Sequence, residues 1–294
     1  MIVSKRISHT GLSRKLNIGC GAHLHGDWCN IDMVRHGRRV ICHDIRTGLP
    51  FQDNWFEMVY HSHVLEHLTP EDGEQLIREC YRVLQPGGIL RIVVPDLEKI
   101  TQLYLQSMRK AWGGDREAEQ DYEWMKLELL DQLVRHQSGG QMGRYMTDER
   151  RDNLKFVKSR VGTEFDTCQA VTGRPAAGAL RMGPSPWRQR MGNMRAMVAG
   201  WLVRGLLGPG KGGALQEGLF RQQGEIHRWM YDRLSLKRLC QACGFRDFRV
   251  CAADESLIPE FPVYQLDAVN GQVRKPDSLF VECRKYAVAA RRAA

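Results

Sequence analysis

Over its first hundred residues the chain alternates short apolar runs with turn residues and amphipathic stretches. Strands that alternate with such stretches pair in parallel within one sheet covered by helices. The pattern therefore predicts an α/β, doubly wound sheet that is mostly parallel and reaches seven strands with two runs near the C-terminus. The expected strands are residues 15–21, 28–33, 40–45, 56–61, 89–96, 245–253 and 278–285.

An amphipathic helix is expected between the fourth and fifth strands. Thr69 is a good N-cap, Pro70 suits the first helical turn, and the acidic residues that follow favour the positive end of the helix dipole. Apolar residues recur at helical spacing until Pro-Gly-Gly at 86–88 ends the helix. A second helix is expected over 227–243, with Gly244 as its stop.

The character of the sequence changes twice along the chain and predicts three parts. They are an N-terminal part of the sheet domain at 1–100, a helical, basic insertion or lid after strand five at 101–225, and a C-terminal completion of the sheet at 226–294. Within the insertion we expect helices at 100–112 and 120–137 and a glycine-bearing loop at 138–146. Residues 191–208 predict a core or oligomer-facing helix, which leaves a homodimer through the insertion open. An interfacial membrane helix is the alternative.

Composition excludes secreted and membrane-spanning classes. No run of about eighteen apolar residues occurs, and the N-terminus lacks the features of a secretory signal, which predicts a cytoplasmic protein. The nine cysteines are an odd number without framework spacing, which argues against a disulfide scaffold. Cys240 and Cys243 have the spacing of half a zinc site. No second pair accompanies them, so we expect both to pack inward from a helix.

The net charge of +9 is concentrated in the middle of the chain. Residues 1–100 hold 12 basic and 12 acidic side chains, whereas 151–225 hold 12 basic and 5 acidic ones. A polyanion would bind there, which leaves RNA open as a partner. Aromatic residues suited to base stacking are sparse in this segment, so a solvated basic surface is the simpler interpretation and nucleic acid the less favoured partner.

The carboxyl ends of the strands are where a doubly wound sheet binds its ligands. Polar or glycine residues stand at four of these ends, namely Gly19-Cys20-Gly21, Asp32, His43-Asp44 and Ser62-His63. For a nucleoside ligand, the glycines allow close approach of the backbone, and Asp32 accepts hydrogen bonds from both ribose hydroxyls. Asp44 accepts from an adenine amine, with Ile45 and Cys42 against the purine. The alternative is that both acids serve only their turns.

These segments together resemble one known family. The motifs are LNIGCG at 16–21, the acid at Asp32, HDI at 43–45, DNWFEMVYHSHVLEHL at 53–68 and ECYRVLQPGGILRIVVPD at 79–96. They look like the class I S-adenosylmethionine-dependent methyltransferases, in the type 11-like branch that has Val-Leu-Glu-His after strand four. The resemblance covers about residues 14–98, with weaker similarity at 227–283. It implies a Rossmann-like fold and S-adenosyl-L-methionine as the cofactor.

The resemblance also implies contacts for the strand-end residues. Gly19 and Gly21, with Cys20 between them, would line the methionine part of the cofactor, Asp32 the ribose, Asp44 and Ile45 with His43 beside them the adenine, and Ser62 and His63 the floor beneath the sulfonium. Asn17 stands where the family usually has an acid, so its amide would contact the cofactor's amino group. The glycine spacing of a dinucleotide fingerprint is absent, which disfavours a nicotinamide dehydrogenase.

Methyl transfer from a sulfonium depends mainly on alignment and desolvation, but an oxygen acceptor also needs a base. The candidates are His63, His67 and His227, because imidazole titrates near neutral pH. His63 is best placed, at the exit of strand four, and Tyr231 or Glu66 would assist. Bracing of the loop is the alternative for Glu66 and His67. Some quinone-type methyltransferases of this fold place a divalent metal at a Glu-His segment, but we assign no metal here.

The expected activity is O-methylation of a small molecule or glycan by an S-adenosylmethionine-dependent methyltransferase. Arg144 and Tyr145, with Tyr122 and Trp124, would supply a cation and aromatic walls for an anionic or sugar-like acceptor. For Trp124 we favour a place in the helix core instead. The alternatives are a cyclase or lyase that releases methylthioadenosine from the same cofactor, and an RNA methyltransferase.

Overall fold

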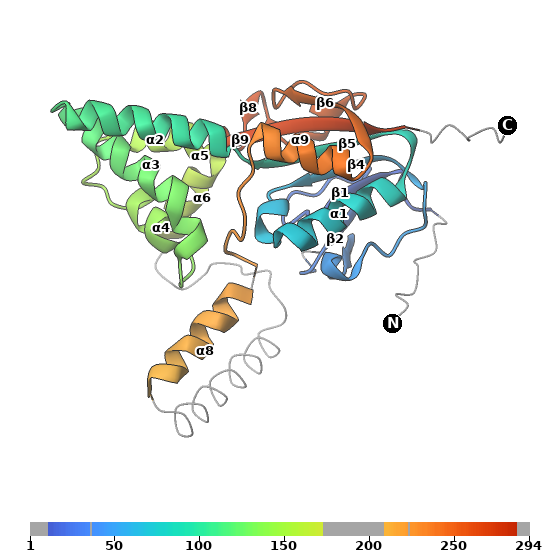
Figure 1. Cartoon of the computed structure of the whole chain (residues 1–294), viewed down its shortest axis with the longest axis horizontal. Helices are drawn as coiled ribbons and strands as arrows, with labels where there is room; N and C mark the ends of the chain where they lie inside the picture. The colour runs from blue at the N-terminus through green and yellow to red at the C-terminus, as the bar shows by residue number, and fades with distance from the viewer. Residues whose placement is uncertain (1–10, 36, 173–208, 223, 287–294) are drawn as a thin grey trace. The chain divides into compact units, whose positions relative to one another are not determined.

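The computed structural model describes residues 11–35, 37–172, 209–222 and 224–286 (Figure 1). The chain forms two compact units. The first comprises Met1–Glu98 and Trp229–Ala294, and the second comprises Lys99–Arg228. The helix expected at 191–208 lies outside the described residues. Among the described helices, none combines the length and the apolar character needed to cross a membrane.

The first unit is built on a seven-stranded sheet in the order β3-β2-β1-β4-β5-β9-β6. Its strands are β1 (Lys15–Ile18), β2 (Cys29–Asp32), β3 (Val40–Cys42), β4 (Phe56–Ser62), β5 (Leu84–Pro95), β6 (Phe245–Cys251) and β9 (Ser278–Lys285). The strands β1 to β5 pair in parallel, and β9 runs antiparallel between β5 and β6. The predicted α/β fold is confirmed. Strand order reverses at β1 and β4, so their carboxyl ends form the switch point where ligands bind.

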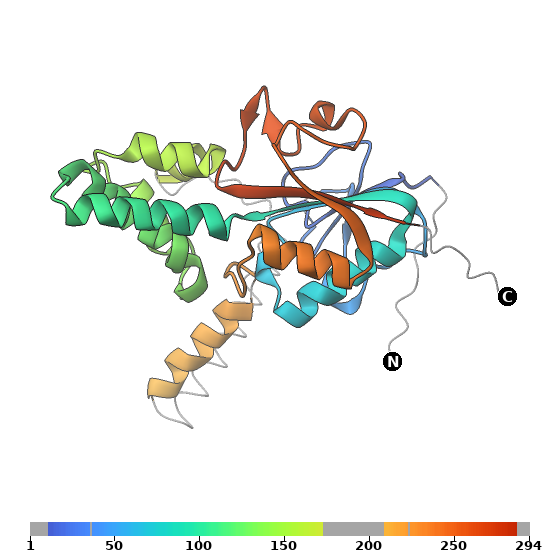
Figure 2. The same ribbon diagram turned by 45° about the horizontal axis from the view of Figure 1, so that its top comes forward.

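Two helices, α1 (Pro70–Val83) and α9 (Arg233–Ala242), cover one face of this sheet and lie side by side (Figure 2). The Thr69 hydroxyl caps α1 by accepting from the Asp72 amide, as the sequence predicts. The prediction that the second helix begins at residue 227 is wrong. Tyr231 bridges to Asp96 beside the sheet, and Asp232 then starts α9 with a capping box shared with Ser235.

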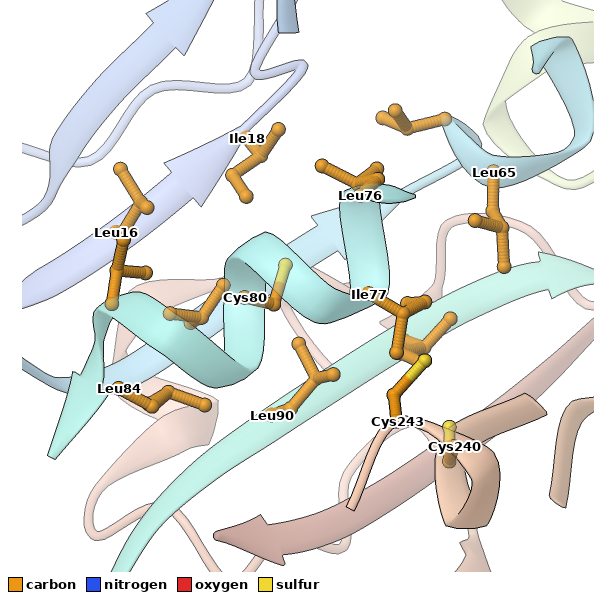
Figure 3. Close-up of a cluster of buried hydrophobic side chains, with 14 of the residues drawn as sticks. Leu16, Ile18, Leu65, Leu76, Ile77, Cys80, Leu84, Leu90, Cys240 and Cys243 are labelled. Atoms are coloured by element: carbon orange, nitrogen blue, oxygen red, sulfur yellow. The ribbon is translucent and has the colours of Figure 1, made fainter. Parts of the chain in front are cut away.

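The core beneath these helices is continuous and apolar. Figure 3 shows Ile77 of α1 close to Cys240 and Cys243 and the strand residues Leu16 and Leu90 in the same cluster. Both cysteines are buried, and both thiols are free. The interpretation that they pack inward is confirmed.

The opposite face of the sheet is covered by irregular chain that follows β6. This segment contains the short helix η3 (Phe261–Tyr264) and the hairpin of β7 (Ala268–Val269) and β8 (Gln272–Val273). Its apolar residues pack with Trp28, Tyr60 and Phe280 of the sheet in a second buried cluster.

Arg91 of β5 fastens this covering segment to the sheet. Its guanidinium is fully buried, with Nε 2.7 Å from Asp267 Oδ2 and Nη1 2.9 Å from Glu282 Oε1. It also donates to the carbonyl groups of Ala252 and Glu255. Each charge is therefore paired where water is excluded.

The second unit is helical. Its described helices are α2 (Leu97–Trp112), which starts at the unit boundary, α3 (Arg116–Val134), α4 (Gly140–Met146), α5 (Leu154–Val161), α6 (Thr163–Thr172) and α8 (Pro209–Gln222). Trp124 is fully buried, which confirms its place in the helix core. The prediction of a loop over 138–146 is wrong. Asp131 of α3 accepts from the amides of Gln141 and Met142 and so satisfies the first donors of α4.

Candidate active site at the strand ends

The glycine turn after β1 has the left-handed backbone that its sequence predicts. Gly19 has φ 64° and Gly21 has φ 52°. A Cβ atom at Gly19 would lie 2.3 Å from Cγ2 of Val64, whereas one at Gly21 would meet nothing within 4 Å. Gly19 is therefore required by the packing of Val64, and Gly21 leaves open space at the strand end where a ligand can approach the backbone.

Asp32 at the end of β2 is joined to this turn. Its Oδ2 accepts from the amide of Gly21 at 2.8 Å, and its Oδ1 accepts from the amide of Val34 at 2.8 Å. These bonds fix the carboxylate beside the open side of the turn. Each oxygen keeps a second lone pair, so the group can still accept from two ligand hydroxyls.

Asn17 and Cys20 face the protein interior. Asn17 is 1% exposed, and its Nδ2 donates to the carbonyl of His23 and to Oδ1 of Asn30, both at 3.0 Å. The amide thus holds the loop that follows the glycine turn. Burial raises the pKa of the Cys20 thiol to about 12, which keeps it neutral. The cofactor contacts expected of both residues stay predictions.

The end of β3 leads into a short helix, η1 (Ile45–Thr47). The Asp44 carboxylate caps it by accepting from the Arg46 amide, and its Oδ2 lies 2.7 Å from Nη2 of Arg46. The side-chain hydrogen bond from Arg46 lowers the pKa of Asp44. His43 Nε2 lies 2.7 Å from the carbonyl oxygen of Gly48. Ile45 packs into the sheet core. Because Asp44 is already paired with Arg46, an adenine bound here would share the carboxylate with that arginine.

His63, directly after Ser62 at the end of β4, is held from both sides. Its backbone has φ 54°, and its amide donates to the carbonyl of Val93 at 2.9 Å. In the ring, Nδ1 lies 2.9 Å from Oε1 of Glu66, and Nε2 lies 2.9 Å from Oγ of Ser278. Ser278 is the first residue of β9 and pairs with Pro95 at the end of β5. An imidazole so oriented can take a proton at Nε2.

Two titratable groups near Glu66 are kept neutral at neutral pH by burial. Glu66 lies fully buried in the short helix η2 (Leu65–His67). His61 is also fully buried, with no hydrogen-bond partner for either ring nitrogen in the described part of the chain, and burial lowers its pKa to about 4. Burial, then the charge of Glu66, raises the pKa of Tyr231 to about 12. The Glu66 carboxylate lies at ion-pair distance from His63 and can stabilise a proton on its ring.

The remaining predicted bases are placed differently. His67 is half-buried in η2, and its amide donates to the carbonyl of Val64. His227 belongs to the second unit, where it is buried and its amide donates to the carbonyl of Gln132 at 2.9 Å. The strand edge thus brings together the glycine turn, Asp32 and His63.

Sequence reasoning missed Ser278 because it lies 215 residues from His63 along the chain. The available signal was its position as the first, polar residue of the last predicted strand. It also missed that the packing of Val64 requires glycine at position 19, since that contact depends on the turn at the end of β4.

Comparison with known proteins identifies part of this unit. Residues 27–92 match the model of a family described as a methyltransferase domain. A probable S-adenosylmethionine-dependent methyltransferase of Mycolicibacterium smegmatis is 31% identical over 114 residues, which cover 32% of this chain and 43% of that protein. A ubiquinone/menaquinone biosynthesis C-methyltransferase of Vibrio cholerae is 28% identical over 133 residues, which cover 42% of this chain and 44% of that protein.

The chain therefore spans less than half the length of the curated relatives it matches. A crystal structure of a SAM dependent methyltransferase from Archaeoglobus fulgidus aligns with 97% of this chain and 89% of that chain, at a TM-score of 0.36 and 12% identity. The matched segment runs from the start of β2 through most of β5 and includes Asp32 and His63. These matches make residues 27–92 similar to the methyltransferase domain family, and the similar segment lies in a doubly wound sheet that places its strand ends at the candidate site.

Proposed function

We propose that this protein transfers the methyl group of S-adenosylmethionine to a hydroxyl oxygen of a small molecule or glycan. The observation that carries this proposal is the position of His63, held between Glu66 and Ser278 at the carboxyl end of β4. An alcohol is a weak nucleophile until a base removes its proton, and this imidazole stands at the strand edge where the family holds its cofactor.

The cofactor supplies a methyl group already activated on a sulfonium. His63 Nε2 takes the proton of the acceptor hydroxyl, the acceptor oxygen forms a bond to the methyl carbon, and the carbon–sulfur bond breaks with its electron pair left on sulfur. The products are the methyl ether and S-adenosylhomocysteine. Glu66 stabilises the positive charge that His63 gains, since its carboxylate lies 2.9 Å from Nδ1.

Open space at Gly21 and the fixed carboxylate of Asp32 support the cofactor assignment. In the proposal the turn contacts the methionine part, Asp32 accepts from the ribose hydroxyls, and Asp44 faces the adenine. Ser62 would lie beneath the sulfonium. The cytoplasmic location, a homodimer and RNA binding by the basic segment stay predictions from the sequence.

C-methylation is a second candidate, because relatives matched over 42% of this chain are C-methyltransferases. A base at His63 would also serve a carbon acid. A cyclase or lyase would instead release methylthioadenosine. Chromatography of the cofactor product separates that case, because either methyl transfer yields S-adenosylhomocysteine.

Calorimetric titration of the full chain with S-adenosylmethionine and S-adenosylhomocysteine tests the proposal first. We expect a Kd in the micromolar range, about 8 kcal/mol of affinity, that Asp32→Ala weakens by at least about tenfold through loss of the ribose contact. Asp254→Ala is the matched control, since Asp254 is exposed on the segment after β6. No binding by the folded wild-type protein would refute the assignment.

Acceptor screening follows with His63→Ala, in which cofactor binding should weaken far less than in Asp32→Ala. His63→Ala should lose turnover about 100-fold or more, because the base acts only on the acceptor. Full turnover by this variant would remove the argument for a deprotonated acceptor.

A further inference from the structure

A groove lies between α3 and α4 in the second unit and encloses about 290 Å³. Its charged and aromatic lining consists of Glu123, Lys126, Arg144, Tyr145, Asp148 and Arg151. Residues 123 and 126 lie on one face of α3, and residues 144 and 145 lie on the facing side of α4.

The floor of the groove is well fixed. Tyr145 is 5% exposed, and its ring centroid lies 5.5 Å from that of Trp124. Its hydroxyl donates to Oδ1 of Asn153 at 3.0 Å. Asp131 binds the start of α4 to α3 through the amides of Gln141 and Met142. The two helices therefore present their side chains from fixed positions, which reduces the ordering cost of binding.

The acidic groups of the groove are already paired. The Arg151 guanidinium lies 4.3 Å from the ring centroid of Tyr145. Its Nη1 is 2.5 Å from Oε2 of Glu123, and its Nε is 3.4 Å from Oδ2 of Asp148. Arg150, outside the groove, is 2.8 Å from Oδ1 of the same Asp148. Both carboxylates thus have cations of the protein as partners.

Two further cations in the groove have no such partner in the described residues. No carboxylate among them lies within ion-pair distance of the exposed Arg144 guanidinium. The Lys126 ammonium lies 5.2 Å from the ring centroid of Tyr122 and likewise pairs with no described carboxylate. Arginine and lysine take carboxylates and phosphates as partners, and arginine can bind them with two parallel hydrogen bonds.

We propose that this groove is an anion-binding site, in which Arg144 and Lys126 bind a carboxylate- or phosphate-bearing ligand. The volume fits one acidic group with part of its carrier rather than a large ligand.

The test is calorimetric titration of the full chain at low salt with inorganic phosphate, glucose 1-phosphate, glucuronate and neutral glucose. We expect saturable binding of at least one anion, none of glucose, and affinity that falls as salt is added. The phosphate and uronate arms distinguish the two kinds of acidic group. Arg144→Ala and Lys126→Gln should each weaken binding about tenfold. Arg109→Ala, which alters an exposed arginine of α2 outside the groove lining, should not.

Absence of saturable binding by any anion overturns the inference, as does wild-type affinity in Arg144→Ala and Lys126→Gln. Equal weakening by Arg109→Ala would reduce the effect to net charge and also overturn it. Titration of the same samples with S-adenosylmethionine separates the two proposals. Loss of anion binding with intact cofactor binding refutes the groove alone, and the reverse result refutes the proposed function alone.

Discussion

His63 adopts a left-handed backbone conformation with φ 54°, which few residues other than glycine occupy. Such conformations persist where the surroundings enforce them, and they gather at functional sites. Here the hydrogen bond from the His63 amide to the Val93 carbonyl and the ring contacts to Glu66 and Ser278 hold the residue. The sequence predicted the residue and its strand end. It did not reveal Ser278, because strand pairing between distant segments decides which residue lies opposite.

Gly19 offers a stability test of the glycine turn. In Gly19→Ala the new Cβ would meet Cγ2 of Val64 at 2.3 Å and the backbone would keep φ 64°, so we expect a loss of about 1–3 kcal/mol in the free energy of unfolding. Urea denaturation measures it. Gly143→Ala in α4 is the control, since no atom lies within 4 Å of its added Cβ. Adding Val64→Ala to Gly19→Ala should recover part of the loss, and a strictly additive double variant would contradict the clash.

His61 should make stability depend on pH. Its pKa is lowered from 6.5 to about 4 by burial, so the unfolded chain binds more protons than the folded one between these values. The stability that neutral His61 contributes is fully present above pH 6.5 and is lost as pH falls toward 4. At pH 5 we expect the free energy of unfolding to be lower by about 2 kcal/mol on this account.

The measurement is the free energy of unfolding at pH 7 and pH 5 in the wild type and in His61→Phe. The difference between the two pH values should shrink in the variant. The exposed His136, changed to Gln, should leave it unaltered. An identical pH dependence in all three proteins would show that His61 is not held neutral.

At the level of elements, periodicity located the strands and the start of α1 well, but it misplaced the start of α9 and missed α4. The amphipathic pattern continues from residue 227 through Tyr231, yet the chain there bridges to Asp96, 135 residues away. The loop expected at 138–146 contains α4 for a similar reason, because the partner of its first amides is Asp131 on another helix. Tertiary contacts decided both cases, and local pattern does not contain them.

The start of α9 can be tested through its cap. Asp232 accepts from the amides of Leu234 and Ser235, and these bonds lower its pKa. Asp232→Ala should therefore reduce the free energy of unfolding by about 1 kcal/mol at neutral pH. Urea denaturation beside Asp254→Ala, an exposed acid outside any helix, provides the comparison. Equal stability of the two variants would mean that the cap contributes nothing.

For the molecule as a whole, the sequence predicted a parallel sheet but not what closes its second face. Irregular chain after β6 does so, and its attachment depends on Arg91 with Asp267 and Glu282. A charged residue within the fifth predicted strand was the visible signal. Its two acidic partners lie 176 and 191 residues further on, so their meeting depends on the complete topology.

Arg91→Met should leave two buried carboxylates without their cation. We expect it to lower the free energy of unfolding by about 3–5 kcal/mol. Hydrogen exchange should report the loss locally, with faster exchange in 252–267 than in α1 and α9. Arg246→Met, on the exposed side of β6, is the matched control. Uniform loss of protection throughout the first unit would instead indicate one cooperative unit.

The position of β9 has a consequence for biosynthesis. This last strand lies between β5 and β6, so during translation β5 presents an unpaired edge until residues 278–285 have left the ribosome. At about 5–20 residues per second the delay is roughly 10–40 s. Ser278 reaches His63 only then, so a nascent chain holds every strand-end residue of the cofactor site well before it holds its oriented base.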